Sequence, residues 1–227
     1  ENWKITIYFM KTALVFGSSG LVGNELVNLL IKNDDYDQIK LFVRKPVKVN
    51  DTKIEIIQTD FYNLDVHSED IQGDDCFYCI GTTKKNSPDK NEYKRIELEI
   101  PIKVGQISKK NLVKTFSFVS SGYANSKHSG DYLRYKGLVE EELKKLSFNK
   151  LGILRPSFLI GKRKEKRIGE KIGIIIFMIL SPLFIGPLKK MKPIPCNLVA
   201  KAMLNISKKD LDKVTYESNE IVELSKK

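Results

Sequence analysis

The chain has 227 residues, of which 41% are hydrophobic and 30% are charged, so it can bury one ordinary core and is neither disordered nor fibrous. Its formal net charge is +11, but the excess lysines are scattered and no recognition helix accompanies them, so we expect a solvated surface and no nucleic-acid partner. The only histidines are His67 and His128, which form no ligand cluster, so no metal site is expected.

Apolar runs alternate with segments of helical periodicity from Lys11 onward. The expected strands are 11–17, 39–44, 53–60, 74–81, 115–121, 150–157 and a short one at 214–217. The expected helices are 21–33, 89–111, 131–147 and a segment near 197–208. Pro101 should kink or interrupt the second helix. This order predicts an α/β fold, with a doubly wound, mostly parallel sheet covered by helices on both faces.

We expect a single domain over residues 10–227, in which 157–196 and 207–227 form a small cap over the carboxyl edge of the sheet. Residues 1–9 precede Met10, and we interpret them as a non-native or flexible extension.

The segment 172–188 has no charged residue and is broken by Ser181-Pro182. It is shorter than the about 20 apolar residues that a membrane span needs, so we expect a buried helix followed by an apolar loop. Such a run can also form a dimer face or a membrane contact, which leaves monomer and homodimer open.

Cys76 and Cys79 form a lone Cys-x-x-Cys pattern in an expected strand. Side chains on a strand alternate between faces, so residues three apart point to opposite sides, which argues against a shared metal or redox site. The odd number of cysteines and the lack of a signal peptide predict a cytoplasmic location.

The first expected strand runs into the sequence GSSGLVG, which places Gly17, Gly20 and Gly23 around the start of a helix. Glycine permits a tight turn and a close approach of ligand to backbone. The free N–H groups and the dipole of a helix N-terminus favour a pyrophosphate. The strand before and the helix after supply the context that a dinucleotide site requires, so the sequence predicts one here.

The end of the second strand selects between nicotinamide cofactors. An acidic residue about 20 positions after the glycine turn binds a free ribose 2′-hydroxyl, but Arg44 and Lys45 stand there instead. Arginine can hold a 2′-phosphate in a fork, so we expect NADP(H) rather than NAD(H). Asp60, at the end of the third strand, is placed to bond the adenine amino group.

Seven motifs occur in order along residues 11–205: GSSGLVG, LFVRK, CIGTTKK, FVSSGYA, YLRYKGLVEEEL, ILRPSFLIG and PIP. In this combination the chain resembles the atypical short-chain dehydrogenase/reductase superfamily, in the NAD(P)H-binding branch that includes the Tat-interacting-protein oxidoreductase. The glycine turn is general to the superfamily, whereas IGTT followed by SSG and YxxxKG is more specific to this branch.

The resemblance implies a three-layer Rossmann fold, NADP(H) and a catalytic group formed by Ser121, Tyr132 and Lys136. It also implies residues that line the cofactor. These are Gly17, Ser18, Ser19, Gly20, Leu21, Val22, Gly23, Arg44, Lys45, Asp60, Phe61, Gly81, Thr82, Thr83, Pro156, Ser157 and Phe158.

The proposed chemistry centres on one helix face. A free tyrosine has a pKa of about 10, and a nearby ammonium favours the phenolate. Tyr132 and Lys136 are four apart and share a face, whereas Tyr135 is adjacent to the lysine and is expected to be a bystander. Tyr132 is then the acid that protonates a carbonyl oxygen, and Ser121 holds the same oxygen.

Three functions remain open at this point. The first is an NADP(H)-dependent oxidoreductase acting on a small carbonyl compound. The second is an NADPH-binding regulatory protein with little turnover, and the third is an epimerase or isomerase. The short segment between Ser121 and Tyr132 and the short apolar tail argue against a nucleotide-sugar substrate.

Overall fold

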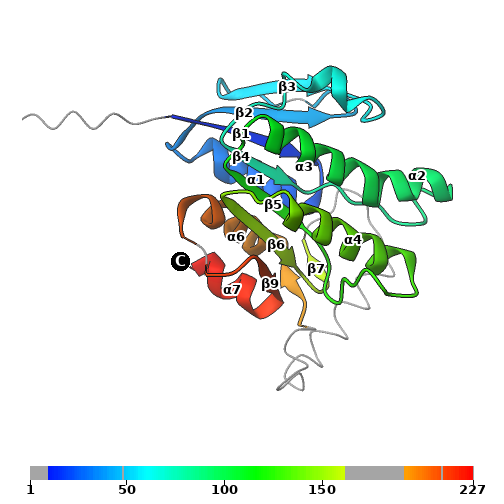
Figure 1. The fold of residues 1–227 in the computed structure, drawn as a ribbon. Coiled ribbons are helices and arrows are strands. Elements are labelled where there is room, and N and C mark those ends of the chain that lie inside the picture. Colours follow the sequence, from blue (N-terminus) through cyan, green and yellow to red (C-terminus); the bar gives the residue numbers. More distant parts are fainter. Residues whose placement is uncertain (1–9, 48, 162–191, 211, 227) are drawn as a thin grey trace, which may run out of the picture.

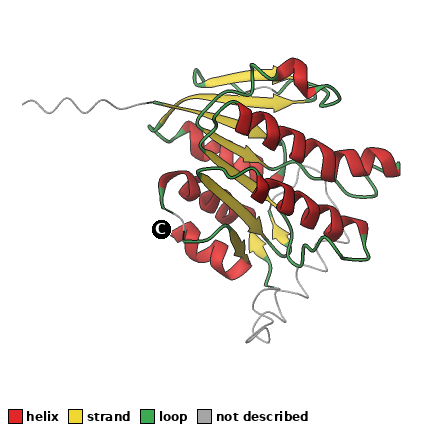
Figure 2. Ribbon diagram, in the orientation of Figure 1, coloured by secondary structure: helices red, strands yellow, loops and turns green. Residues whose placement is uncertain are grey.

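The computed structural model describes residues 10–47, 49–161, 192–210 and 212–226. A seven-stranded sheet lies at its centre (Figures 1 and 2). Its strands are β1 (Lys11–Phe16), β2 (Tyr36–Val43), β3 (Ile54–Gln58), β4 (Asp75–Tyr78), β5 (Thr115–Val119), β6 (Lys150–Arg155) and β9 (Thr215–Glu217). The order in space is β3-β2-β1-β4-β5-β6-β9 and every pairing is parallel. The predicted doubly wound α/β sheet is confirmed, and its order reverses between β1 and β4.

Helices cover both faces of the sheet, which gives the three layers visible in Figure 1. The α-helices are α1 (Leu21–Ile31), α2 (Lys90–Lys94), α3 (Ile100–Lys110), α4 (Asp131–Lys145), α6 (Cys196–Lys208) and α7 (Ser218–Lys226). A 3₁₀ turn, η1 (Leu64–His67), precedes β4, and a π-helical turn, η2 (Arg95–Glu99), joins α2 to α3. The short strands β7 (Leu159–Ile160) and β8 (Ile194–Pro195) pair with each other.

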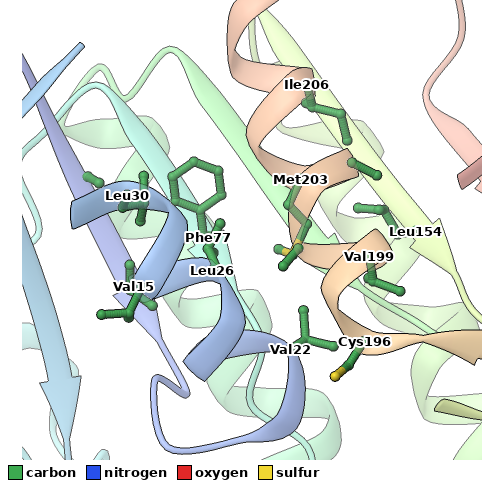
Figure 3. Close-up of a cluster of buried hydrophobic side chains, with 14 of the residues drawn as sticks. Val15, Val22, Leu26, Leu30, Phe77, Leu154, Cys196, Val199, Met203 and Ile206 are labelled. Carbon is green, nitrogen blue, oxygen red and sulfur yellow. The ribbon is translucent and has the colours of Figure 1, made fainter. Parts of the chain in front are cut away.

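Each face of the sheet carries its own core because successive strand side chains alternate. On β1, Val15 belongs to the core under α1, α6 and α7, whereas Phe16 belongs to the core under α3 and α4. Figure 3 shows the first of these cores, in which Leu26 of α1 and Met203 of α6 meet over Phe77 of β4. Strands buried on both faces need nearly continuous apolar sequences, and the central strands β1, β4 and β5 are largely apolar and buried.

The helix around Pro101 is interrupted, as predicted. Proline has no N–H to donate to the preceding turn, and the chain meets this by widening into the π-helical η2 directly before α3. Pro101 then occupies the first turn of α3, where a missing N–H costs little. The widened turn contains Glu97, which is fully buried.

The tail differs from the predicted cap. Residues 215–217 form β9, which pairs with β6 in the main sheet, and α7 packs on α6. Residues 215–226 are therefore part of the sheet and its helical layer, because Tyr216, Ile221 and Leu224 are needed to cover the core. The apolar run 172–188 and residues 1–9 lie outside the described residues. Within the described part of the chain, no helix has both the length and the apolar character to cross a membrane.

Candidate cofactor and catalytic site

The glycine turn after β1 is a place where backbone segments pass too closely for side chains. Gly17 has a φ of 90°, and a Cβ there would lie 2.8 Å from the carbonyl carbon of Cys79. A Cβ on Gly23 would lie 2.1 Å from the carbonyl oxygen of Gly17. The first turn of α1 contains no acidic side chain, and its N-cap, Gly20, has no side chain that could bond the N–H groups there. These N–H groups are therefore available to an anion.

The side chains of the turn divide into two kinds. Ser19 is exposed, while the hydroxyl of Ser18 is buried and has no hydrogen-bond partner among the described residues. A buried hydroxyl without a partner is unfavourable unless a ligand completes it, so Ser18 fits a phosphate-binding turn. Leu21 and Val22 pack on the core under α1, so these two predicted cofactor residues can offer only their backbone to a phosphate.

Arg44 and Asp60 lie on one hollow of about 470 Å³ at the ends of β2 and β3. Arg44 is exposed, and Lys45 beside it is exposed as well. Asp60 accepts a hydrogen bond from the N–H of Tyr62 at 2.8 Å. Phe61 has a φ of 65° and its ring is buried 6.3 Å from that of Phe16, so its side chain belongs to the core and only its backbone faces the edge.

The loop after β4 holds Gly81, Thr82 and Thr83 beside the glycine turn, because the N–H of Cys79 donates to the carbonyl of Phe16 at 2.8 Å. The Thr82 hydroxyl lies 3.0 Å from that of Ser87. Gly81 and Thr83 are exposed at this edge of the sheet. The loop therefore occupies the switch point between β1 and β4, where ligands bind in sheets of this order.

Tyr132 and Lys136 come together on α4 as predicted. The Lys136 ammonium lies 5.9 Å from the centre of the Tyr132 ring and 3.5 Å from the carbonyl oxygen of Val119 at the end of β5. Tyr132 is 38% exposed, whereas Lys136 is 3% exposed. Tyr135 is turned toward Tyr93, with the ring centres 6.2 Å apart, so it packs beside the pair as expected.

The close approach of α4 to the loop after β5 explains the glycine after Lys136. A Cβ on Gly137 would lie 2.2 Å from the backbone nitrogen of Ser126. Any side chain at this position would push the first turns of α4 away from the loop that follows Ser121. The glycine of the YxxxKG motif is therefore a packing requirement that keeps the tyrosine and lysine at the sheet edge.

Two serines follow β5, and the structure distinguishes them. The hydroxyl of Ser120 donates to Oε1 of Glu140 at 2.5 Å, and that carboxylate also binds Arg155. Ser120 is therefore committed to a buried network. Ser121 is half-buried, and its hydroxyl lies 3.4 Å from the carbonyl of Gly122. Such a long contact leaves the Ser121 hydroxyl free to bind another group.

Glu97 was not among the predicted site residues. Its Oε2 lies 3.0 Å from the Lys136 ammonium, and its Oε1 accepts a hydrogen bond from the Thr82 N–H at 2.5 Å. Burial alone would lower the pKa of Lys136, but the charge of Glu97, assisted by Tyr132, outweighs it, and the pKa of the ammonium is raised. The sequence held one signal: Glu97 occupies the apolar stripe of its helix, in line with Pro101 and Val104.

The residues after β6 are tied to the tail. The carbonyl of Pro156 accepts from the N–H of Gly122 at 2.9 Å, and the N–H of Ser157 donates to the hydroxyl of Ser218 at 2.8 Å. The Ser157 hydroxyl donates to the carbonyl of Lys192. Phe158 is 59% exposed. Of these predicted residues, Phe158 is the most exposed.

Known proteins resemble this chain in sequence or in fold. A family described as NAD(P)H-binding matches residues 17–173. The rat Protein HTATIP2 is 28% identical over 201 residues, covering 86% of this chain and 80% of the rat protein. Protein FMP52-1, mitochondrial, of Scheffersomyces stipitis is 28% identical over 229 residues, covering 95% of this chain and 99% of the yeast protein. Bordetella bronchiseptica WbmH in complex with NAD+ has the same fold, with a TM-score of 0.70 at 16% identity over 96% of this chain and 80% of that one.

The yeast relative is named as mitochondrial, which contradicts the predicted cytoplasmic location. The prediction rested on the odd number of cysteines and on the lack of a signal peptide, and the packing of the cysteines shows that they do not indicate a compartment. Cys76 and Cys196 are free thiols in the core, so they serve as small apolar side chains in any compartment. Cys76 and Cys79 do lie in different cores, as predicted.

The family match covers most of the chain, and the glycine turn and the parallel sheet fit the group that this family binds. The chain therefore belongs to the NAD(P)H-binding family.

Proposed function

We propose that this protein is an NADP(H)-dependent oxidoreductase that reduces a small carbonyl compound, with Tyr132 as the general acid. The observation that carries the proposal is the partly exposed Tyr132 ring beside the buried Lys136 ammonium, at the edge where β5 ends. The bound nicotinamide supplies the hydride, and the protein supplies the proton and the orientation.

Backbone groups and one cation would hold the cofactor. The free N–H groups at the start of α1 and the unpartnered Ser18 hydroxyl suit the pyrophosphate. Arg44 is exposed on its hollow and forms no ion pair with a described carboxylate, which suits the 2′-phosphate. The chain after β2 carries this arginine and Lys45 where NAD-selective proteins carry an acid, which supports NADP(H).

The reduction places a hydride on the carbonyl carbon and a proton on its oxygen. Tyr132 donates that proton from its hydroxyl, and the resulting phenolate is stabilised by the Lys136 ammonium beside it. Ser121 donates a hydrogen bond to the same oxygen as it gains negative charge. The hydroxyl of Ser120 already donates to Glu140, so Ser121 is the serine whose hydroxyl can bind the substrate oxygen.

The test is NADPH oxidation by the wild type against a panel of small aldehydes and ketones, after NADPH binding has been measured by fluorescence. Tyr132→Phe should slow reduction at least about 100-fold, a typical loss for a general acid, with NADPH affinity nearly unchanged. Tyr135→Phe is the matched control and should behave as the wild type. Reduction by Tyr132→Phe at the wild-type rate would refute the assignment. NADPH binding without oxidation by any carbonyl would favour the regulatory alternative.

A further inference from the structure

The Glu97 carboxylate contacts two parts of the candidate site at once. Oε1 accepts from the backbone N–H of Thr82 at 2.5 Å, and Oε2 lies 3.0 Å from the Lys136 ammonium. The two side chains of the ion pair are 0% and 3% exposed. Oε2 is not aligned for a full hydrogen bond with any described group, so its contact with the ammonium is mainly one of charge.

A buried carboxylate at this position has a large desolvation cost, which packing does not explain, because an apolar side chain would fill the same space more favourably. It also lies in a π-helical turn, a distortion that is frequent at functional sites. Its two contacts are with the loop at the sheet's switch point and with the proposed catalytic lysine. The arrangement therefore points to a role in the site.

We propose that Glu97 is a positioning residue that fixes the Lys136 ammonium beside Tyr132 and links it to the cofactor-side loop at Thr82. This inference rests on the proposed function of Lys136. The carbonyl of Val119 accepts from the ammonium at 3.5 Å, and the charge of Glu97 restrains the group from a second side.

The pair also keeps Lys136 protonated. The groups that face it are Glu97 on η2, Tyr132 and Glu140 on α4, and Cys79 after β4. Burial disfavours the charged amine, and Glu97 is the main influence in the other direction. If Glu97 becomes neutral, burial dominates, and the pKa of Lys136 falls below its value in the unfolded chain.

The change from a raised to a lowered pKa of Lys136 reverses how the stability of the protein depends on pH. In the wild type the raised pKa of Lys136 contributes stability below the unfolded pKa of about 10.4, and that contribution is lost as pH rises through the folded pKa. In Glu97→Gln the lowered pKa means that the folded state is penalised at neutral pH, and the penalty is relieved as pH rises. The Tm of Glu97→Gln should therefore rise from pH 7 to pH 10 relative to its control.

The control is Glu99→Gln, which removes an exposed carboxylate paired with Lys94 at 3.0 Å in the same helical turn. Glu97→Asp keeps the charge and should keep the wild-type pH dependence. Glu97→Gln retains an oxygen for the Thr82 N–H, whereas Glu97→Ala does not. NADPH should therefore bind up to about tenfold more weakly to Glu97→Ala than to Glu97→Gln, about the value of one neutral hydrogen bond.

The decisive experiment measures Tm against pH and NADPH affinity for these variants, and the pH profile of kcat with any carbonyl that the wild type reduces. Two results would support the inference. The Tm of Glu97→Gln rises between pH 7 and pH 10 relative to that of Glu99→Gln, and its kcat declines at a lower pH than that of the wild type. Parallel Tm curves for Glu97→Gln and Glu99→Gln would overturn the inference. If the wild type reduces no carbonyl, the proposed function fails on its own, and the Tm slopes and NADPH affinities still decide the role of Glu97.

If Glu97→Gln does not fold, the double variant Glu97→Gln/Lys136→Met replaces it. Removing both charges should give a more stable protein than Lys136→Met alone, because that single variant leaves a buried carboxylate unpaired. A double variant no more stable than the single one would show that the two side chains are not coupled, and the inference would be wrong.

Discussion

The two halves of the sheet's carboxyl edge are built in different ways. At β1, β2 and β3 the candidate site consists of backbone N–H groups, small residues and the exposed Arg44. At β4, β5, β6 and α4 it depends on buried carboxylates and their cations, namely Glu97 with Lys136 and Glu140 with the partly exposed Arg155. The first half can change without loss of the fold, whereas the second contributes to stability and chemistry together.

The largest effect should follow a change in the charged half. Lys136→Met leaves the buried Glu97 carboxylate without a partner, which should cost about 3–5 kcal/mol of unfolding free energy and abolish carbonyl reduction. Urea denaturation measures the cost. Lys145→Met, an exposed lysine of the same helix paired with Glu142, should unfold as the wild type does. Equal stability of the two variants would mean that the halves do not differ as described.

Gly23→Ala tests the backbone half at its tightest contact. The new Cβ would lie 2.1 Å from the Gly17 carbonyl oxygen, so the turn must shift, at about 1–3 kcal/mol, and NADPH binding should be lost. In Gly20→Ala the new Cβ would lie 3.3 Å from the same oxygen. The losses of stability and of NADPH affinity should therefore both be smaller than in Gly23→Ala. Calorimetry and fluorescence titration measure the two effects. Wild-type affinity in Gly23→Ala would show that this turn does not hold the cofactor.

Arg44→Ala should separate binding from stability. The side chain is exposed and contributes nothing to the core, so Tm should not change. NADPH affinity should fall about 10- to 100-fold, as for the loss of a hydrogen-bonded charge pair, while NADH affinity stays the same. Lys32→Ala, an exposed cation at the far end of α1, is the control. An equal loss for both cofactors would contradict a role in 2′-phosphate recognition.

The smallest effect should come from the thiols between the halves. Burial raises the pKa of Cys76 and raises that of Cys79 to about 12, so neither forms an appreciable thiolate at pH 8. The folded protein should therefore resist alkylation of both by iodoacetamide at pH 8, and urea should make them react. Mass spectrometry locates the adducts. Rapid alkylation of Cys76 in the folded protein would mean that β4 is not packed as described.

The backbone half was largely predictable from the sequence, and the charged half was not. A glycine turn and a strand-end arginine are local features, so GSSGLVG and Arg44 could be interpreted without the fold. Glu97 and Lys136 are distant in sequence, and only the packing of η2 against α4 brings them together. The same holds for Ser120, whose partner Glu140 lies on α4.

Two further predictions differ from the structure because they also depended on contacts between residues that are distant in sequence. Val22 and Phe61 were predicted from the family resemblance to line the cofactor, but their side chains fill the two cores. The tail was predicted as a cap although a strand was expected at 214–217, because the sequence pattern does not show that this three-residue strand pairs with β6. It joins the sheet because β6 would otherwise leave an unpaired edge there.

A crystal structure with NADPH tests the central claim most directly. The account predicts the pyrophosphate at the start of α1, the 2′-phosphate against Arg44, and the nicotinamide next to Tyr132 with Lys136 still paired to Glu97. A nicotinamide bound away from Tyr132, or a 2′-phosphate without contact to Arg44, would contradict it.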